Sequence, residues 1–215
     1  MRTRLFDGAV ASAAAAGAGL ELILSILPPN PHGLSGTLIS YFSYFTLDTN
    51  VLVAVAMGWS ALAPESGPGR FFSRPGVRAA LTLYIMLVAL VYHFMLRDLW
   101  TPPGIAKVSN FLLHYVAPVL MLIDWLMLSR KDGLKLGQII PWMAFPAGYA
   151  TLVMARGAMT GIYPYGFLDA SRIGWSASLI NIAGMILGMG LAGCVMVLAA
   201  RRLPGRGAYG AEPAK

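Results

Sequence analysis

Residues 41–64 read YFSYFTLDTNVLVAVAMGWSALAP, an apolar run of membrane length that opens with hydroxyl, amide and carboxyl side chains. Crossing the hydrocarbon layer of a bilayer takes about 20 helical residues. Polar groups are costly inside that layer and normally face the interior of a helix bundle or a water-filled cavity. The stretch therefore predicts a membrane helix whose first turns line a polar site.

The composition of the whole chain is that of an integral membrane protein. Of its 215 residues, 57% are hydrophobic and only 12% are charged, whereas soluble domains are about one quarter charged. Because the connecting segments are short and rich in turn residues, we expect one domain over residues 1–203, followed by a disordered tail over 204–215. The expected fold is all-α and polytopic, with six transmembrane helices near 5–27, 38–62, 78–96, 108–128, 139–157 and 174–200.

The distribution of lysine and arginine predicts the orientation of the helices. Cytoplasmic segments of membrane proteins carry an excess of these residues. With the N-terminus inside, 12 of the 16 lysines and arginines fall on the cytoplasmic side, and the first outer loop has none. We therefore expect a multi-pass protein of a bacterial inner membrane with both termini in the cytoplasm. The net charge of +7 does not indicate a nucleic-acid partner in such a protein.

Given this orientation, the polar residues of the spans gather in the outer half of the bundle. Thr46 and His114 lie about 12 Å and about 9 Å below the outer ends of their helices, at 1.5 Å per residue. Glu21 and His93 also belong to the outer parts of their helices, whereas Asp124 belongs to the inner half. The sequence thus predicts a polar pocket that opens outward.

Helical spacing indicates which side chains share a face in the second expected helix. Ser43, Thr46 and Asn50 follow the spacing i, i+3, i+7, so they lie on one face. Asp48 points away from Thr46. Thr49 is an alternative hydroxyl three residues after Thr46, and a threonine in a membrane helix also commonly bonds a carbonyl of its own helix.

The fourth expected helix brings a histidine and an amide together. Asn110 and His114 are i, i+4 neighbours, and Pro118 follows one turn later. The proline lacks an N–H, so we expect a free backbone carbonyl in the turn that holds His114. A buried histidine can also serve only to hydrogen-bond two helices, and His93, one turn before Arg97, favours such a structural role.

Three stretches together resemble a known family: YFSYFTLDTN at 41–50, NFLLHYVAPVLMLIDWL at 110–126 and GIYPYGFLD at 161–169. They are similar to the androgen-induced protein family of six-helix membrane proteins, whose characterised members hydrolyse fatty acid esters of hydroxy fatty acids. The resemblance implies an intramembrane threonine nucleophile and a histidine, and the matching positions are Thr46 and His114. The last stretch, with Tyr163 and Asp169, resembles the aromatic-proline motif of the family's last outer loop.

The chemistry that these residues support is ester hydrolysis. A threonine hydroxyl is a poor nucleophile without a base, and a neutral histidine, with an ordinary pKa near 6.5, can take its proton. The other groups that we expect around the pair are the amides Asn50 and Asn110 as oxyanion donors, Ser43 and Thr49 as pocket hydroxyls, and Asp48, Glu21, His93, Tyr163 and Asp169 as orienting or substrate-contacting residues. Spacing does not choose the acid that orients His114.

Two other functions fit parts of the pattern. A transporter or lipid-binding protein would use the same polar pocket without chemistry, although the sequence shows no inverted repeat of the kind that transporters carry. A haem site would need His93 and His114 on adjacent helices. For the hydrolase we expect a lipid ester or fatty acyl substrate within the bilayer, no cofactor, no metal and no nucleic-acid partner.

Overall fold

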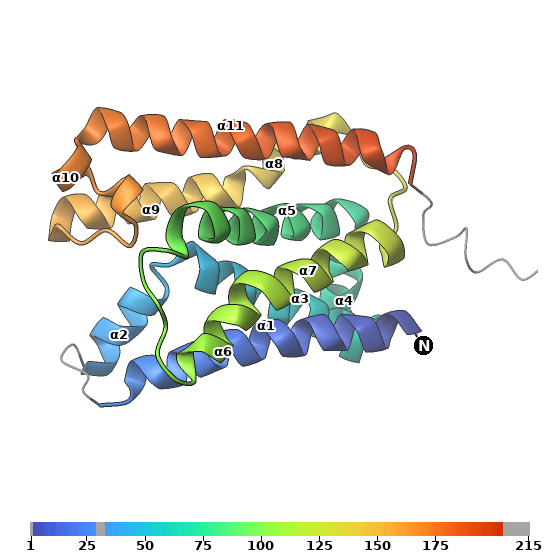
Figure 1. Cartoon of the computed structure of the whole chain (residues 1–215). Coiled ribbons are helices and arrows are strands. Elements are labelled where there is room, and N and C mark those ends of the chain that lie inside the picture. Colours follow the sequence, from blue (N-terminus) through green and yellow to red (C-terminus); the bar gives the residue numbers. More distant parts are fainter. Residues whose placement is uncertain (1, 29–32, 204–215) are drawn as a thin grey trace, which may run out of the picture.

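The computed structural model describes residues 2–28 and 33–203, and within these ranges the chain contains helices and loops but no strand (Figure 1). The tail expected at 204–215 lies outside the described residues. The described part of the chain is therefore all-α, as predicted. By length and composition, five helical stretches could cross a membrane, against the six that the sequence predicted. The five are Thr3–Ile26, Phe45–Leu62, Pro75–Leu96, Ala106–Leu128 and Trp175–Ala200.

The elements along the chain are mostly long helices joined by short turns. They are α1 (Arg2–Ile26), α2 (Gly33–Tyr41), α3 (Phe45–Leu62), α4 (Gly67–Phe72), α5 (Pro75–Val91), η1 (Tyr92–Leu96), α6 (Ala106–Phe111), η2 (Leu112–Val116), α7 (Ala117–Ile123), η3 (Asp124–Leu128), η4 (Leu136–Gln138), α8 (Ile139–Trp142), α9 (Ala144–Thr160), η5 (Gly166–Leu168), α10 (Ala170–Ile173) and α11 (Trp175–Ala200). The segments η1, η2 and η3 are π-helical and continue the α-helices beside them.

The single helix predicted over 38–62 is wrong, because the chain turns between α2 and α3. Tyr44 has an extended backbone, with φ −100° and ψ 120°, and α3 begins after it. The carbonyl of Ser43 accepts a hydrogen bond from the Tyr149 hydroxyl at 2.8 Å. A tertiary contact therefore takes up a carbonyl that a continuous helix would bond internally.

The helix predicted over 139–157 is also divided, at Met143 between α8 and α9. Pro146 lacks the N–H that would bond the carbonyl of Trp142 in a regular helix. The Tyr84 hydroxyl on α5 donates to that carbonyl instead. The break leaves α9 with 17 residues, and this segment is not among the five membrane-length helices.

The helices form a bundle with α5 at its centre (Figure 1). α1 packs along α3, and α5 contacts α3, α7 and α11. α8 and α9 lie beside α11. The first turn of α1 and the last turn of α11 lie at the same end of the bundle, while α2 and α10 lie at the other end.

A buried ion cluster ties three helices together at the end where α1 begins. The Arg78 guanidinium lies 3.1 Å from the Asp7 carboxylate and 3.0 Å from that of Asp124. Its Nε also donates to the Phe72 carbonyl, and the Ser129 hydroxyl donates to Asp124. We call these residues the Arg78 cluster, and all of its polar groups named here have partners.

Candidate functional site

Thr46 and His114 come together although 68 residues separate them in the chain. The hydroxyl oxygen of Thr46 lies 3.5 Å from Nε2 of His114. Thr46 stands in the first turn of α3, and His114 stands in η2. Of the two hydroxyls that the sequence left open, it is Thr46 that faces the histidine. Thr49 is fully buried, and its hydroxyl has no partner among the described residues.

The second ring nitrogen of His114 fixes its tautomer. Nδ1 lies 2.9 Å from the carbonyl oxygen of Asn110. A carbonyl only accepts, so Nδ1 carries the hydrogen and Nε2 keeps its lone pair toward Thr46. His114 is therefore held as a hydrogen-bond acceptor for the Thr46 hydroxyl, which is the geometry that a general base needs.

A backbone carbonyl, and not an acid, orients His114. Of the three carboxylates considered from the sequence, Glu21 accepts from the Ser109 hydroxyl at 2.8 Å. Asp169 caps α10 and accepts from the Ser171 amide at 3.0 Å. Asp48 lines a separate groove. None of the three bonds the imidazole.

Tyr92, which no sequence pattern indicated, packs directly against His114. The two rings are stacked, with centroids 3.8 Å apart and planes 21° from parallel. The Tyr92 hydroxyl accepts a hydrogen bond from Nδ2 of Asn110 at 2.6 Å. Asn110 thus holds both the imidazole, through its carbonyl, and the tyrosine, through its amide. The spacing of polar residues in the sequence does not indicate such a tyrosine, because its aromatic ring makes the contact.

Pro118 and the π-turn η2 create the free carbonyl that the sequence predicted. In η2 the Ala117 amide bonds the carbonyl of Leu112, and Pro118 has no N–H to offer the next carbonyl, that of Leu113. Nδ2 of Asn50 bonds this carbonyl at 3.3 Å and that of Thr46 at 2.8 Å. Asn50 is fully buried, so its amide braces α3 against η2 and points at carbonyls instead of open space.

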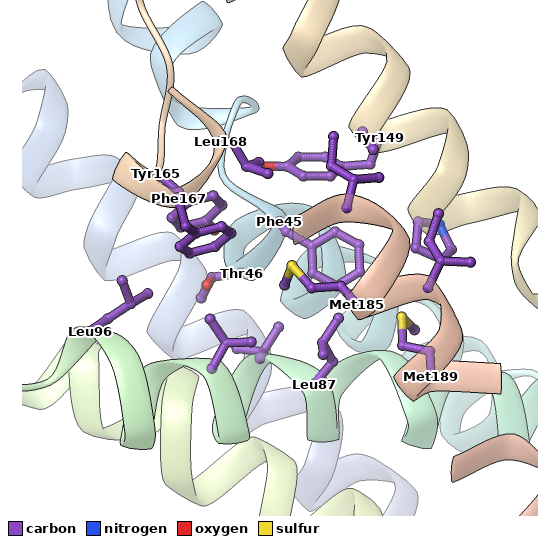
Figure 2. Close-up of a pocket in the computed structure, with 16 residues that line it drawn as sticks. Phe45, Thr46, Leu87, Leu96, Tyr149, Tyr165, Phe167, Leu168, Met185 and Met189 are labelled. Carbon is purple, nitrogen blue, oxygen red and sulfur yellow. The ribbon is translucent and has the colours of Figure 1, made fainter. Parts of the chain in front are cut away.

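Two cavities meet at Thr46. A polar cavity of about 720 Å³ is lined by Glu21, Tyr92, Asn110 and His114 among others. On the other side of Thr46 lies an apolar cavity, whose walls are mainly Leu, Val, Ile, Met and Phe side chains (Figure 2). Thr46, Leu96 and Tyr165 line both cavities. The Thr46 hydroxyl therefore stands where a polar space and a hydrocarbon-like space adjoin.

Tyr165 approaches Thr46 from the loop before η5 (Figure 2). Its ring stacks on Phe167, with centroids 5.1 Å apart. Burial raises the pKa of the Tyr165 phenol to about 12, while hydrogen bonds with the side chain and amide of Thr46 lower it. The phenol consequently stays protonated at neutral pH and offers an O–H donor beside the hydroxyl of Thr46.

The first turn of α3 adds backbone donors near the same hydroxyl. The first N–H groups of a helix have no partner within it. Here the Leu47 and Asp48 amides bond the carbonyl of Tyr44, and the Thr46 amide, one position earlier, lies in the same first turn of α3. The turn at 42–44 therefore gives Thr46 the surroundings of a helix start, which a continuous helix would not provide.

Ser43 and Asp48 do not belong to this site, which corrects the predicted face. Both line a groove between α3 and α9, where Arg156 donates to the Ser43 hydroxyl at 2.8 Å. The helical spacing that placed Ser43 beside Thr46 fails because Ser43 lies in the turn before α3. The expectation that Asp48 points away from Thr46 is confirmed.

His93 and Tyr163 also lie outside both cavities. His93 contacts the Tyr115 hydroxyl at 3.2 Å and Arg97 at 3.1 Å, so it links the end of its own helix to η2. The Tyr163 ring covers Gly157 so closely that a Cβ there would collide with it. Among the described residues, no three His, Cys, Asp or Glu side chains form a group that would hold a metal ion.

Comparison of the chain with models of protein families, with curated proteins and with solved structures found no match.

Proposed function

We propose that the protein is a membrane-embedded hydrolase of lipid esters, with Thr46 as nucleophile and His114 as general base. The observation that carries this proposal is the contact of 3.5 Å between the Thr46 hydroxyl and Nε2 of His114. Because Nδ1 bonds a carbonyl, the imidazole is held in the tautomer that accepts the proton of the hydroxyl.

In the first step the Thr46 oxygen attacks the ester carbonyl carbon, and its proton passes to Nε2 of His114. The tetrahedral intermediate collapses as the bond between the carbonyl carbon and the alcohol oxygen breaks. His114 returns its proton to the leaving alcohol, and the acyl group remains on Thr46. The stacked ring of Tyr92 and the carbonyl of Asn110 keep the imidazole in place through both transfers.

Donors for the developing oxyanion come from Tyr165 and from the amide of Thr46. Such donors must lie about 2.7–3.1 Å from the position of the oxyanion. Both groups lie at the nucleophile, since Tyr165 and Thr46 line the same two cavities, and the start of α3 adds the positive end of a helix dipole. In this proposal they replace Asn50, whose amide bonds two carbonyls.

In the second step a water from the polar cavity attacks the acyl-threonine. His114 takes a proton from the water, the bond between the Thr46 oxygen and the acyl carbon breaks, and the proton returns to Thr46. The products are a fatty acid and the regenerated hydroxyl. The acyl chain enters the apolar cavity, whose lining has almost no polar groups besides Thr46 and two tyrosines. This cavity has a volume of about 60 Å³, so its walls must move apart to hold a long chain.

The substrates in this proposal are long-chain acyl esters, including the fatty acid esters of hydroxy fatty acids that the family resemblance implies. We further propose that α8 and α9 together form a sixth crossing and that both termini face the cytoplasm of a bacterial inner membrane. The first turn of α1 and the last turn of α11 lie at the same end of the bundle (Figure 1), which supports an even number of crossings.

Labelling of the purified protein with a fluorophosphonate tests the proposal. We expect the label on the native protein and on Thr49→Ala, but not on Thr46→Ala, and a strongly slowed reaction in His114→Ala. Thr49 is the matched control, because it is a threonine of the same helix with a buried hydroxyl away from His114. Unchanged labelling of Thr46→Ala would refute the nucleophile. Absence of both labelling and lipid-ester hydrolysis would favour a transporter or lipid-binding protein that uses the same cavities.

A further inference from the structure

The polar cavity has an unusual charge for a site that would bind fatty acid derivatives. Among the described residues that line it, Glu21 is the one carboxylate, and there is no lysine or arginine. Lys107, on the same helical stretch as His114, is exposed and does not line the cavity. Any ligand in this space therefore meets a negative group with no fixed positive side chain to offset it.

Glu21 is fixed by a hydrogen bond and not by an ion pair. Oε2 of Glu21 accepts from the Ser109 hydroxyl at 2.8 Å, and Ser109 itself is fully buried. The salt bridges of the described residues involve Arg78, Arg97 and Arg130, and none of them includes Glu21. The carboxylate thus keeps acceptor capacity for a ligand, and its position is set by α6.

Aromatic rings supply the rest of the wall. Tyr41, Tyr44, Tyr92 and Trp100 all line the polar cavity. The Tyr41 hydroxyl donates to the carbonyl of Ala18 at 2.8 Å, which fixes this ring next to α1. Rings of tyrosine and tryptophan attract cations through their faces, and quaternary ammonium groups are bound in this way in proteins.

From this combination we propose that the polar cavity selects esters whose alcohol half carries a positive charge, and that Glu21 is the residue that sets the preference. The reaction itself rests on the proposed function, whereas the preference for a cation rests on the cavity alone. A quaternary ammonium alcohol would place its charge against Glu21 and the rings, with its ester oxygen toward Thr46. An alcohol that bears a carboxylate close to its ester oxygen would meet repulsion from Glu21 instead.

Three octanoyl esters with different alcohol halves test this preference on the purified full-length protein. They are octanoylcholine, which is cationic, 3,3-dimethylbutyl octanoate, which has the same shape without charge, and octanoyl glycolate, which is anionic. We expect kcat/KM to fall in this order, with at least about a tenfold span between the first and the last. Glu21→Gln should reduce this span severalfold, because hydrolysis of the cationic ester slows while that of the anionic ester quickens, and loss of structure would not give two opposite changes. Glu65→Gln, an exposed carboxylate between α3 and α4, is the control and should keep the span.

The outcomes separate the two proposals. If hydrolysis depends on Thr46 but the anionic ester is the best substrate, or if Glu21→Gln leaves the span intact, the cation preference is wrong while the hydrolase stands. If no ester is hydrolysed, the hydrolase is wrong, and quenching of tryptophan fluorescence by octyltrimethylammonium still tests the site through Trp100. Weaker binding to Glu21→Gln than to the native protein would support the cation site, and equal binding would overturn it.

Discussion

The bundle contains two buried polar clusters, and they differ in how completely their groups are paired. In the Arg78 cluster the guanidinium has two carboxylate partners and a carbonyl, and Asp124 also has Ser129. Around Thr46 and His114 the groups border two cavities, and Thr46 meets the imidazole at a loose 3.5 Å. The groups of the Arg78 cluster are bonded to one another, whereas Thr46 and His114 border cavities that a ligand could enter.

This difference separates two uses of costly polar burial. Buried charges that pair with one another fix the positions of helices. When one partner is removed, the main effect is a loss of stability. Polar groups that face a cavity lower the stability of the fold, and they are retained because they bind a ligand or act on it. Substitutions in the two clusters should therefore have opposite profiles, with stability lost in the first and activity lost in the second.

The largest effect that we expect is on turnover, from His114→Gln. Glutamine keeps a hydrogen-bonding side chain but cannot act as a base at neutral pH, so ester hydrolysis should fall by up to about 10⁴-fold. The melting temperature in detergent should change little by comparison. Steady-state hydrolysis and a thermal unfolding curve measure the two. A large loss of thermal stability with activity retained per folded molecule would place His114 with the structural cluster.

Arg78→Met should produce the reverse profile. It leaves the carboxylates of Asp7 and Asp124 buried without a cation, which costs about 3–5 kcal/mol of stability. The exposed pair of Arg130 and Asp132 provides the control, since Arg130→Met should cost no more than about 1 kcal/mol. Unfolding in denaturant, monitored by circular dichroism, gives both values. Equal effects of the two substitutions would show that the Arg78 cluster does not hold the bundle together.

Tyr92→Phe should have a smaller effect on turnover, because it changes only a residue that holds His114 in place. The ring still stacks on His114, but the hydroxyl that accepts from Asn110 at 2.6 Å is lost. A hydrogen bond of this kind contributes about 1 kcal/mol, so kcat should fall by about fivefold with KM nearly constant. A change confined to KM would instead assign the hydroxyl to substrate binding.

The smallest effect should come from Thr49→Val. Valine has nearly the shape of threonine, and the substitution removes a buried hydroxyl that has no partner among the described residues. Stability should rise by up to about 1 kcal/mol with hydrolysis unchanged, because an unpaired buried polar group is itself costly. A fall in hydrolysis to the level of Thr46→Ala would contradict the assignment of Thr46, and not Thr49, as the nucleophile.

The sequence predicted well those features that depend on local pattern. Hydropathy and spacing predicted helices of membrane length, and the i, i+4 pair of Asn110 and His114 lies at the cavity as expected. The proline rule predicted a free carbonyl near His114, and the structure identifies it as that of Leu113. The family resemblance favoured Thr46 over Thr49, and Thr46 is the hydroxyl that faces the histidine.

What the sequence missed depends on contacts between distant segments. The breaks in the helices expected at 38–62 and 139–157 are accompanied by hydrogen bonds from Tyr149 and Tyr84, which lie far away in the chain. Spacing assumes a continuous helix, so one turn at 42–44 was enough to move Ser43 to another face. The stacking of Tyr92 on His114 needs the packing of α5 against α7, which no local pattern encodes.

The turn at 42–44 also separates α2 from α3, the helix that carries Thr46. Membranes differ in thickness, and a continuous helix answers such a mismatch by tilting along its whole length. Here the turn separates the short helix α2 from α3, and α3 packs along α1. We therefore expect Thr46 and His114 to keep their distance when the protein is moved from short-chain to long-chain lipids, so that the lipid composition of its membrane sets the access of substrate more than the rate of the reaction.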